Sequence, residues 1–293
     1  AVVPLLVKDG HDITVVSSGN TALPDNSHWK NVTILNANYR RRDEAWHKFI
    51  REIDADVVID IPAIDIPGTY REIQEHVQQY IAFGCYRMYG EASIVPTPEE
   101  AQNQCEFPEL AERFGEILGI QNQAIADVVQ FTALVPTEIM GPGAVPMNGL
   151  GGYELSVHKQ HANGEVIKLP LGGHSLFAPI DVEDVARAVL AVVNNPEQAA
   201  GEILNIGPSY AITLDKFVQE LSTAYRKNIP LEYIPWDEYF QKYNPDPGRN
   251  YIFRTHMAPD ISKIRRILQF EPMIAPEAVI ERSIDWMRKN QLI

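Results

Sequence analysis

Apolar residues follow two patterns along this chain. Short continuous apolar runs, typical of strands buried on both faces of a sheet, stand at 13–16, 32–35, 57–61, 80–83, 128–135 and 203–207. Segments with apolar residues at helical spacing lie between or beside them, at 1–10, 42–53, 69–79, 107–126 and 181–194. Because strands alternate with helices, the pattern predicts a doubly wound parallel α/β sheet.

The stretch 55–90 is the centre of this pattern, because it reads as strand, helix and strand. In an open α/β sheet, ligands bind outside the carboxyl ends of the strands. Pro62 and Ala63 follow the first strand, and Cys85 and Tyr86 follow the second. We therefore expect the functional site between these two strand ends.

The rest of the chain continues the alternation and then breaks into smaller pieces. Gly10 is suited to cap the first helix, and Asp181 to cap the helix that ends near 194. A polar, proline-containing loop is expected at 91–104, and a short strand at 166–169. Further helical segments are expected at 149–164, 213–226, 236–242, 260–268 and 276–290.

Composition narrows the class of protein. The 293 residues are 45% hydrophobic and 22% charged, which suits one large globular domain or two unequal ones. The net charge of −14 disfavours nucleic acid as a partner, because phosphate neutralisation dominates such binding. The run Arg40–Arg42 is the densest basic segment, and it holds one phosphate group or is a solvated helix start.

Cysteine and histidine usage argues against a disulfide scaffold and a metal site. Cys85 and Cys105 are the two cysteines, and neither HExxH nor CxxC occurs. Such usage suits a reducing compartment, so we expect a cytoplasmic protein, or one of the plastid stroma in a eukaryote. No apolar run approaches the roughly 20 residues of a membrane span.

The chain opens on a helix, whereas a dinucleotide-binding unit opens on a strand and a glycine-rich turn. That strand lies at the centre of its sheet and the turn holds a pyrophosphate. We therefore expect roughly 10–20 residues to precede Ala1, since a strand of about 5–6 residues and a turn need that many. The alternative is a natural chain without a cofactor loop.

Several motifs resemble the extended short-chain dehydrogenase/reductase superfamily, in its NAD(P)-dependent epimerase/dehydratase group. They are VVIDIPA (57–63), MYG (88–90), VPTEIMGPG (135–143), IDVEDVARAVLAVV (180–193), GEILNIG (201–207) and PDISKIRRILQFEP (259–272). The spacing from 57 to 90 and the segment 256–263 are most similar to the branch of the chloroplast stem-loop-binding proteins.

This resemblance implies a Rossmann-type domain, formed by 1–145 and 178–208, and a smaller mixed substrate-binding domain, formed by 146–177 and 209–293. It also implies a homodimer built through the helices at 69–79 and 107–126. The resemblance further implies NADP or NAD as the cofactor, if the chain binds either. Ser17, with Arg40 nearby, favours NADP, because NAD-binding proteins have at this position an acidic residue that hydrogen-bonds the ribose hydroxyl. The expected cofactor-binding residues are Ser17, Ser18, Asn38, Arg40, Ile61, Pro62, Ala63 and Pro136.

The sequence departs from the family at its acid–base pair. The family uses a Tyr-x-x-x-Lys pair with a serine, in which the lysine lowers the pKa of the tyrosine. Cys85 occupies the serine position, and the segment 104–114 contains neither Tyr nor Lys. Glu106 and Glu109 stand there instead, as general bases or as a solvated helix start.

The other candidate catalytic residues surround the same strand ends. Cys85 is a nucleophile or a space-filling residue. Tyr86 is a phenol whose pKa Arg87 would lower, and Glu138 lies on the turn that faces the reacting carbon in the family. The candidate substrate-binding residues, which otherwise make polar domain contacts, are His174, Tyr251, Arg254 and His256.

These observations favour a small-molecule biosynthetic enzyme that works by isomerisation, epimerisation, elimination or reduction with non-standard acid–base residues. The alternatives are an RNA-associated relative of the stem-loop-binding proteins and a catalytically inactive scaffold.

Overall fold

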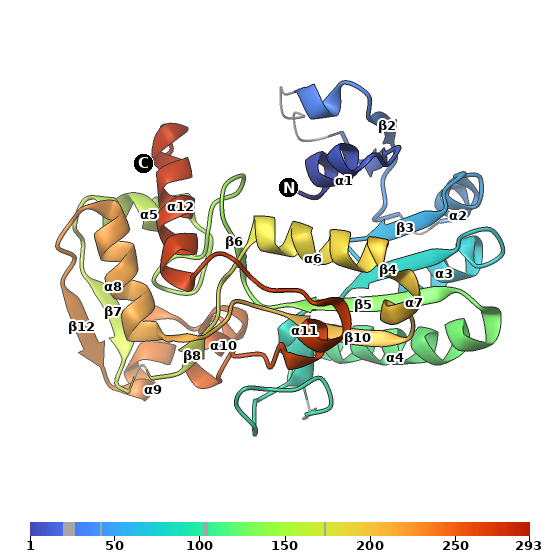
Figure 1. Ribbon diagram of the computed structural model, residues 1–293. Helices are drawn as coiled ribbons and strands as arrows, with labels where there is room; N and C mark the ends of the chain where they lie inside the picture. Colours follow the sequence, from blue (N-terminus) through green and yellow to red (C-terminus); the bar gives the residue numbers. More distant parts are fainter. Residues whose placement is uncertain (20–26, 42, 102–104, 173) are drawn as a thin grey trace.

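The computed structural model describes residues 1–19, 27–41, 43–101, 105–172 and 174–293. Figure 1 shows a twisted parallel sheet with helices on both faces, and a second group of helices and short strands beside its end. The doubly wound α/β fold expected from the sequence is therefore confirmed. The division into domains at the predicted boundaries stays a prediction.

The main sheet has four parallel strands in the order β10-β5-β4-β3. Their bounds are Val57–Asp60 for β3, Gln79–Phe83 for β4, Gln130–Pro136 for β5 and Glu202–Ile206 for β10. Every residue of β4 is buried, as expected of an apolar run in the middle of a covered sheet. Parallel pairing brings the carboxyl ends of β4 and β5 to the same edge of the sheet.

Alternate side chains of the strands pack against different helices. Tyr80 and Phe131, whose ring centroids lie 5.6 Å apart, belong to the core shared with α3 (Ile66–Ile73) and α4 (Pro108–Asp127). Ile81 and Leu134 point to the opposite face, where they share a core with Val189 of α6 (Val182–Asn194). In Figure 1, α6 and α4 accordingly lie on opposite sides of the sheet.

Strands β1 (Thr14–Ser17) and β2 (Thr33–Asn36) form a separate two-stranded parallel sheet. Among the described residues, β1 pairs with β2 alone and β3 pairs with β4 alone. The described sheet is thus in two pieces at the position where the sequence leads us to expect a central strand, and that strand stays a prediction. Helices α1 (Val2–Asp9), η1 (Ser27–Trp29) and α2 (Glu44–Arg51) belong to this part of the chain. Helices α7 (Pro196–Ala199) and α11 (Ser262–Leu268) lie at the other side of the main sheet, beside β5 and β10.

The second group of elements joins segments far apart in the sequence. β7 (Ile167–Pro170) pairs in parallel with β12 (Leu231–Ile234), and β8 (Leu176–Phe177) pairs antiparallel with β11 (Ile212–Thr213). The short parallel pair β6 (Ile139–Met140) and β9 (Ile180–Asp181) lies between the two groups. The remaining elements are η2 (Tyr86–Tyr89), α5 (Leu155–Ala162), α8 (Leu214–Tyr225), α9 (Trp236–Glu238), the π-helix η3 (Tyr239–Tyr243), α10 (Pro247–Arg254) and α12 (Pro276–Lys289).

Three helices differ from expectation for local reasons. α3 begins at Ile66 rather than near 69, because the Asp65 side chain accepts a hydrogen bond from Gly68 N. The predicted helix at 149–164 begins only at Leu155, because a tight loop occupies 148–152. α10 was not predicted, although Asp246 caps it as an N-cap residue.

The Thr213 hydroxyl caps α8 by accepting a hydrogen bond from Lys216 N at 3.2 Å. We expect Thr213→Ala to lower the free energy of unfolding by about 1 kcal/mol, because a backbone donor of the first turn loses its partner. Urea denaturation measures this loss. Thr213→Ser is the matched control, since it keeps the hydroxyl, and an equal loss in both variants would contradict the capping role.

Candidate functional site

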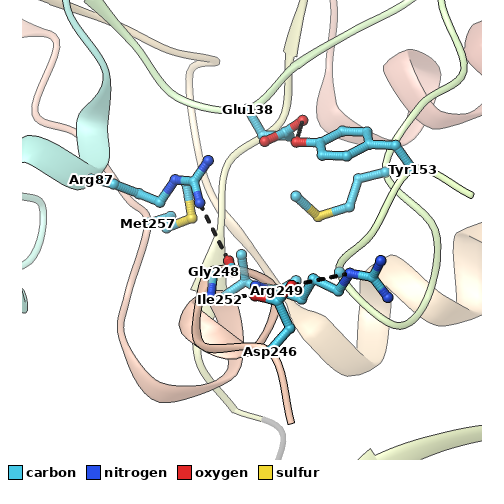
Figure 2. Close-up of a pocket in the computed structure, with 10 residues that line it drawn as sticks. Arg87, Glu138, Tyr153, Asp246, Gly248, Arg249, Ile252 and Met257 are labelled. Atoms are coloured by element: carbon cyan, nitrogen blue, oxygen red, sulfur yellow. Dashed lines mark hydrogen bonds and ion pairs between the residues drawn. The ribbon is translucent and has the colours of Figure 1, made fainter. Parts of the chain in front are cut away.

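A cavity of about 160 Å³ opens beside the carboxyl ends of the central strands (Figure 2). Arg87 of η2, Glu138 after β5 and Tyr153 before α5 reach it from three separate segments. The other lining residues are Met147, Gly151, Asp246, Gly248, Arg249, Ile252 and Met257. The site therefore lies next to the predicted strand ends, with one wall formed by α10 and the segment that precedes it.

Backbone contacts hold Glu138 at the end of β5. The Glu138 carbonyl accepts a hydrogen bond from Ile180 N at 2.8 Å. The preceding Thr137 hydroxyl donates to the Ala178 carbonyl at 2.5 Å. The turn after β5 is thereby joined to the segment that leads into α6.

A tight loop presents Tyr153. The buried Asn148 side chain accepts hydrogen bonds from Leu150 N at 2.9 Å and Gly152 N at 3.2 Å. Gly151 has φ +78°, and a Cβ atom there would lie 2.5 Å from the Arg249 carbonyl oxygen. This position therefore requires glycine both for its backbone conformation and for its contact with α10.

Glu138 and Tyr153 form the central contact of the cavity. The Tyr153 hydroxyl donates to Glu138 Oε1 at 2.6 Å. Burial raises the pKa of the Glu138 carboxyl, although the hydrogen bond from Tyr153 and the charge of Arg87 act against the rise. Burial and the negative Glu138 also raise the pKa of the Tyr153 phenol, so it stays protonated at neutral pH. The pair combines a proton donor with a carboxylate acceptor.

Arg87 supplies positive charge on another side of the cavity. Its Nη1 donates to the Gly248 carbonyl at 3.3 Å. Burial opposes the charge, but the Cys85 thiol, Tyr153 and Glu138 together outweigh it and raise the pKa of Arg87. Arg87 is therefore a permanent cation.

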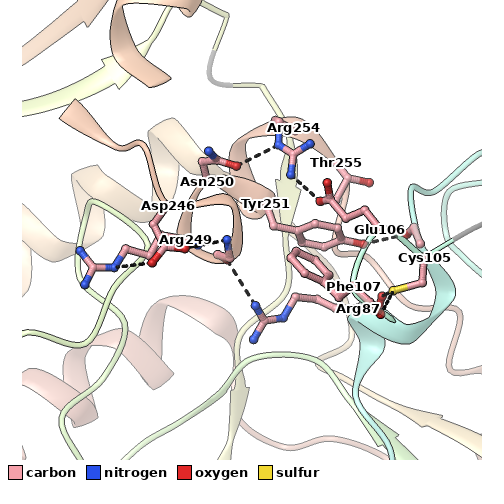
Figure 3. A network of polar contacts seen from close by, with 12 residues as sticks. Arg87, Cys105, Glu106, Phe107, Asp246, Arg249, Asn250, Tyr251, Arg254 and Thr255 are labelled. Atoms are coloured by element: carbon pink, nitrogen blue, oxygen red, sulfur yellow. Dashed lines mark hydrogen bonds and ion pairs between the residues drawn. The ribbon is translucent and has the colours of Figure 1, made fainter. Parts of the chain in front are cut away.

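Among the predicted catalytic residues, Arg87 and Glu138 line the cavity and the others do not. Cys85 lies beside Arg87 and carries a free thiol. Glu106 forms an ion pair with Arg254 of α10 (Figure 3). Glu109 is exposed in the first turn of α4. The two glutamates therefore fit the alternative of a helix start at the surface.

The expectation that the pKa of the Tyr86 phenol is lowered is wrong. Its hydroxyl is buried, donates to Thr97 Oγ1 at 2.7 Å and accepts from Ala258 N at 3.3 Å. Burial raises the pKa of the Tyr86 phenol, instead of Arg87 lowering it. Adjacent residues of η2 point different ways, so Arg87 reaches the cavity while Tyr86 joins the strand end to the loop at 97 and the tail.

None of the four predicted substrate-binding residues lines the cavity. The Tyr251 hydroxyl is buried and donates to the Gly90 carbonyl at 2.7 Å, and its ring packs edge-on against Phe107 (Figure 3). His256 Nδ1 accepts from Leu176 N at 3.0 Å, and Arg254 is paired with Glu106. His174 is exposed. Tyr251, Arg254 and His256 thus make the polar domain contacts that were the alternative.

The predicted cofactor-binding residues lie at the carboxyl ends of parallel strands. Ser17 ends β1, and Asn38 and Arg40 follow β2. Ile61, Pro62 and Ala63 follow β3, where Ala63 N donates to Asp60 Oδ1 at 2.8 Å. Ser18 follows Ser17, and Pro136 ends β5. The run at 40–42 is described only in part, because residue 42 lies outside the described residues.

Sequence reasoning missed Tyr153 as a site residue. One signal was present, because Tyr153 is the sole tyrosine between Tyr89 and Tyr210 and directly follows Gly151-Gly152. The apolar residues Met147, Ile252 and Met257 carried no signal, since apolar residues usually form core.

The family model of the NAD dependent epimerase/dehydratase family matches residues 71–207. The motifs, the fold and this match agree. Over these residues the match supports the resemblance to the extended short-chain dehydrogenase/reductase superfamily. No comparison separates the stem-loop-binding branch from the rest of this superfamily, so the branch stays a prediction. No helix in the described part of the chain is long and apolar enough to cross a membrane.

Solved structures show the same fold over nearly the whole chain. A UDP-glucose 4-epimerase from Thermotoga maritima, solved with UDP-glucose, is 18% identical with a TM-score of 0.77, covering 99% of this chain and 95% of that one. An epimerase from Methanothermobacter thermautotrophicus is 18% identical with a TM-score of 0.76, covering 98% and 88%. A UDP-glucuronic acid 4-epimerase from Bacillus cereus, in complex with NAD, is 15% identical with a TM-score of 0.74, covering 99% and 94%.

Proposed function

We propose that this protein is an NAD(P)-dependent epimerase/dehydratase-type enzyme whose acid–base chemistry is carried by Glu138 and Tyr153. The observation that carries this proposal is the 2.6 Å hydrogen bond between these side chains inside the cavity. The family's Tyr-x-x-x-Lys pair is absent from the sequence, so another donor and acceptor must do its work. The Glu138–Tyr153 pair meets that need at the carboxyl edge of the sheet, where such sites lie.

The strand ends support the cofactor part of the proposal. Ile61 is 52% exposed directly after β3, where a large apolar side chain has no core to join and suits contact with a planar ring. Ser17, Asn38 and Arg40 offer polar groups for a ribose and its phosphate at the neighbouring strand ends. A bound nicotinamide would supply reversible hydride transfer. Ser17 in place of an acid, together with Arg40, favours NADP, whereas the Bacillus cereus neighbour was solved with NAD.

The chain's own residues then move protons. The Glu138 carboxylate accepts a proton from the substrate, and its raised pKa makes it a stronger base than an ordinary glutamate. In an elimination, the Tyr153 hydroxyl protonates the departing hydroxyl group. The proton held by Glu138 then returns to the Tyr153 oxygen along their hydrogen bond, which restores the pair.

Isotope exchange tests this function without knowledge of the natural substrate. We would incubate the protein with NAD or NADP in D₂O with nucleotide sugars, sugar acids and sugar phosphates, and follow deuterium incorporation by mass spectrometry. We expect incorporation into at least one compound. If neither incorporation nor a change in nicotinamide absorbance occurs with any of them, the enzymatic proposal fails and the inactive relative is favoured.

A further inference from the structure

We propose that Arg87 is the binding site for the anionic group of the substrate, so that the substrate is a small hydroxy compound bearing a carboxylate or a phosphate. This inference rests on the proposed function, since it names the substrate class of the same cavity. It follows from the charges around the cavity, from its lining and from where Arg87 lies relative to Glu138 and Tyr153.

Arg87 is a partly buried cation with no ion pair. In the described part of the chain, no carboxylate oxygen lies within 4.0 Å of its guanidinium nitrogens. Its hydrogen bond goes to the Gly248 carbonyl, which carries no charge, and Cys85 lies beside it. A guanidinium carries five N–H donors and pairs with carboxylates and phosphates through two of them at once. The cavity thus presents unused donors of the kind that recognise an anion.

The other charged side chains of the cavity each have a partner of their own. Arg249 forms an ion pair with Glu154 and lies 3.7 Å from an Asp246 oxygen. The Asp246 carboxylate also accepts from Gly248 N at 2.8 Å, as the cap of α10. Glu138 accepts a hydrogen bond from the neutral Tyr153 hydroxyl and attracts Arg87 only from beyond ion-pair distance. Among the described lining residues, Arg87 is therefore the cation without a carboxylate in direct contact.

The apolar part of the lining increases what Arg87 would gain by pairing with an anion. Met147, Ile252 and Met257 line the cavity together with the polar groups. A cation in apolar surroundings is costly unless it is paired, so an arriving anion would gain more here than at the surface. A neutral ligand would leave Arg87 uncompensated after expelling water.

The position of Arg87 relative to Glu138 and Tyr153 would also orient the substrate for reaction. Figure 2 shows Arg87 and the Glu138–Tyr153 pair on different sides of one cavity. An anion held by Arg87 would direct the adjoining hydroxyl-bearing carbons toward the acid–base pair. The volume of about 160 Å³ is well below the roughly 300 Å³ at which pockets for drug-sized ligands begin, so the part of the substrate that enters is small.

Calorimetric titration with three matched probes tests the inference. Glucose, glucuronate and glucose 6-phosphate share a hexose and differ in carrying no anion, a carboxylate or a phosphate. We expect one or both anions to bind at least about 10-fold more tightly than glucose, since hydrogen bonds to charged groups are worth about 1.5–3 kcal/mol and each 1.4 kcal/mol is tenfold. The stronger of the two anions identifies the substrate's group.

Variants assign the preference to Arg87. Arg87→Gln should abolish it, Arg87→Lys should retain part of it because the charge remains, and Arg266→Gln, an exposed arginine of α11, should leave it unchanged. The inference is overturned if glucose binds as tightly as both anions. It is also overturned if the preference for the anions persists in Arg87→Gln, or if Arg87→Lys retains no preference. Loss of isotope exchange with the anion preference intact would instead count against the proposed function alone.

Discussion

Glu138→Gln is expected to lower kcat/KM by about 100- to 10,000-fold, the usual contribution of a general acid–base residue. The substitution keeps the shape of the side chain and its contact with Tyr153 but removes the proton acceptor. Steady-state kinetics on the compound found by isotope exchange measures the loss. Glu109→Gln is the matched control, because Glu109 is exposed on α4 and does not line the cavity. An unchanged kcat/KM in Glu138→Gln would remove Glu138 from the mechanism.

The pH dependence gives this prediction a second readout. Because burial raises the pKa of Glu138, its basic form appears at a higher pH than for an ordinary glutamate. Activity should therefore rise with pH along an acid limb that lies above pH 4.5, the ordinary value for this group. This limb should be absent from the residual activity of Glu138→Gln, and its persistence would assign it to another group.

The effect on stability separates loss of chemistry from loss of folding. A carboxyl whose folded pKa is raised contributes stability below its unfolded pKa, and this contribution is lost as the pH rises through the folded pKa. At neutral pH the ionised, half-buried Glu138 therefore adds no stability by this route. We expect Glu138→Gln to be at least as stable as the natural chain at pH 7 in urea denaturation.

Asn205→Ala is expected to lower the free energy of unfolding by about 3 kcal/mol, because unsatisfied buried polar groups cost about 1–3 kcal/mol each. The Asn205 side chain is fully buried in β10. Its amide donates to the carbonyls of Thr97 at 3.0 Å and Asp260 at 3.2 Å, and its oxygen accepts from the Tyr89 hydroxyl at 2.9 Å. Truncation leaves these three groups without this partner. The side chain thus joins the sheet, the loop at 97 and the tail.

Urea denaturation measures this loss, with Asn122→Ala as the matched control. The Asn122 amide donates to the Leu118 carbonyl on the exposed side of α4, so its removal should change stability by less than about 0.5 kcal/mol. A loss below about 1 kcal/mol in Asn205→Ala would show that Asn205 does not join the three segments energetically.

Local chemistry determined most elements before the structure was known. The continuous apolar runs became β3, β4, β5 and β10, because strands covered on both faces need no polar side. Gly10, with φ +98°, ends α1, and Asp181 caps α6 through Glu183 N. The start of α3 differed because Asp65 was overlooked as a cap.

The candidate site depended far more on tertiary structure. Arg87 and Glu138 were predictable, because each follows a buried strand and strand ends meet at one edge of the sheet. Tyr153 was not, since its place depends on the Asn148 loop and the approach of α10. Tyr86 and Tyr251 do not reach the cavity for the same reason, because contacts with distant segments bury both hydroxyls.

The sequence by itself determined the parallel α/β fold, the resemblance to the epimerase/dehydratase family and the absence of the usual Tyr-x-x-x-Lys pair. Periodicity and capping are local properties, so they can be read along the chain. Only the tertiary structure brought the Tyr153 hydroxyl to 2.6 Å from Glu138 and placed Arg87 at the same cavity, with no carboxylate of the described residues in ion-pair contact with it. Such contacts arise where separate segments converge, and no local pattern encodes them.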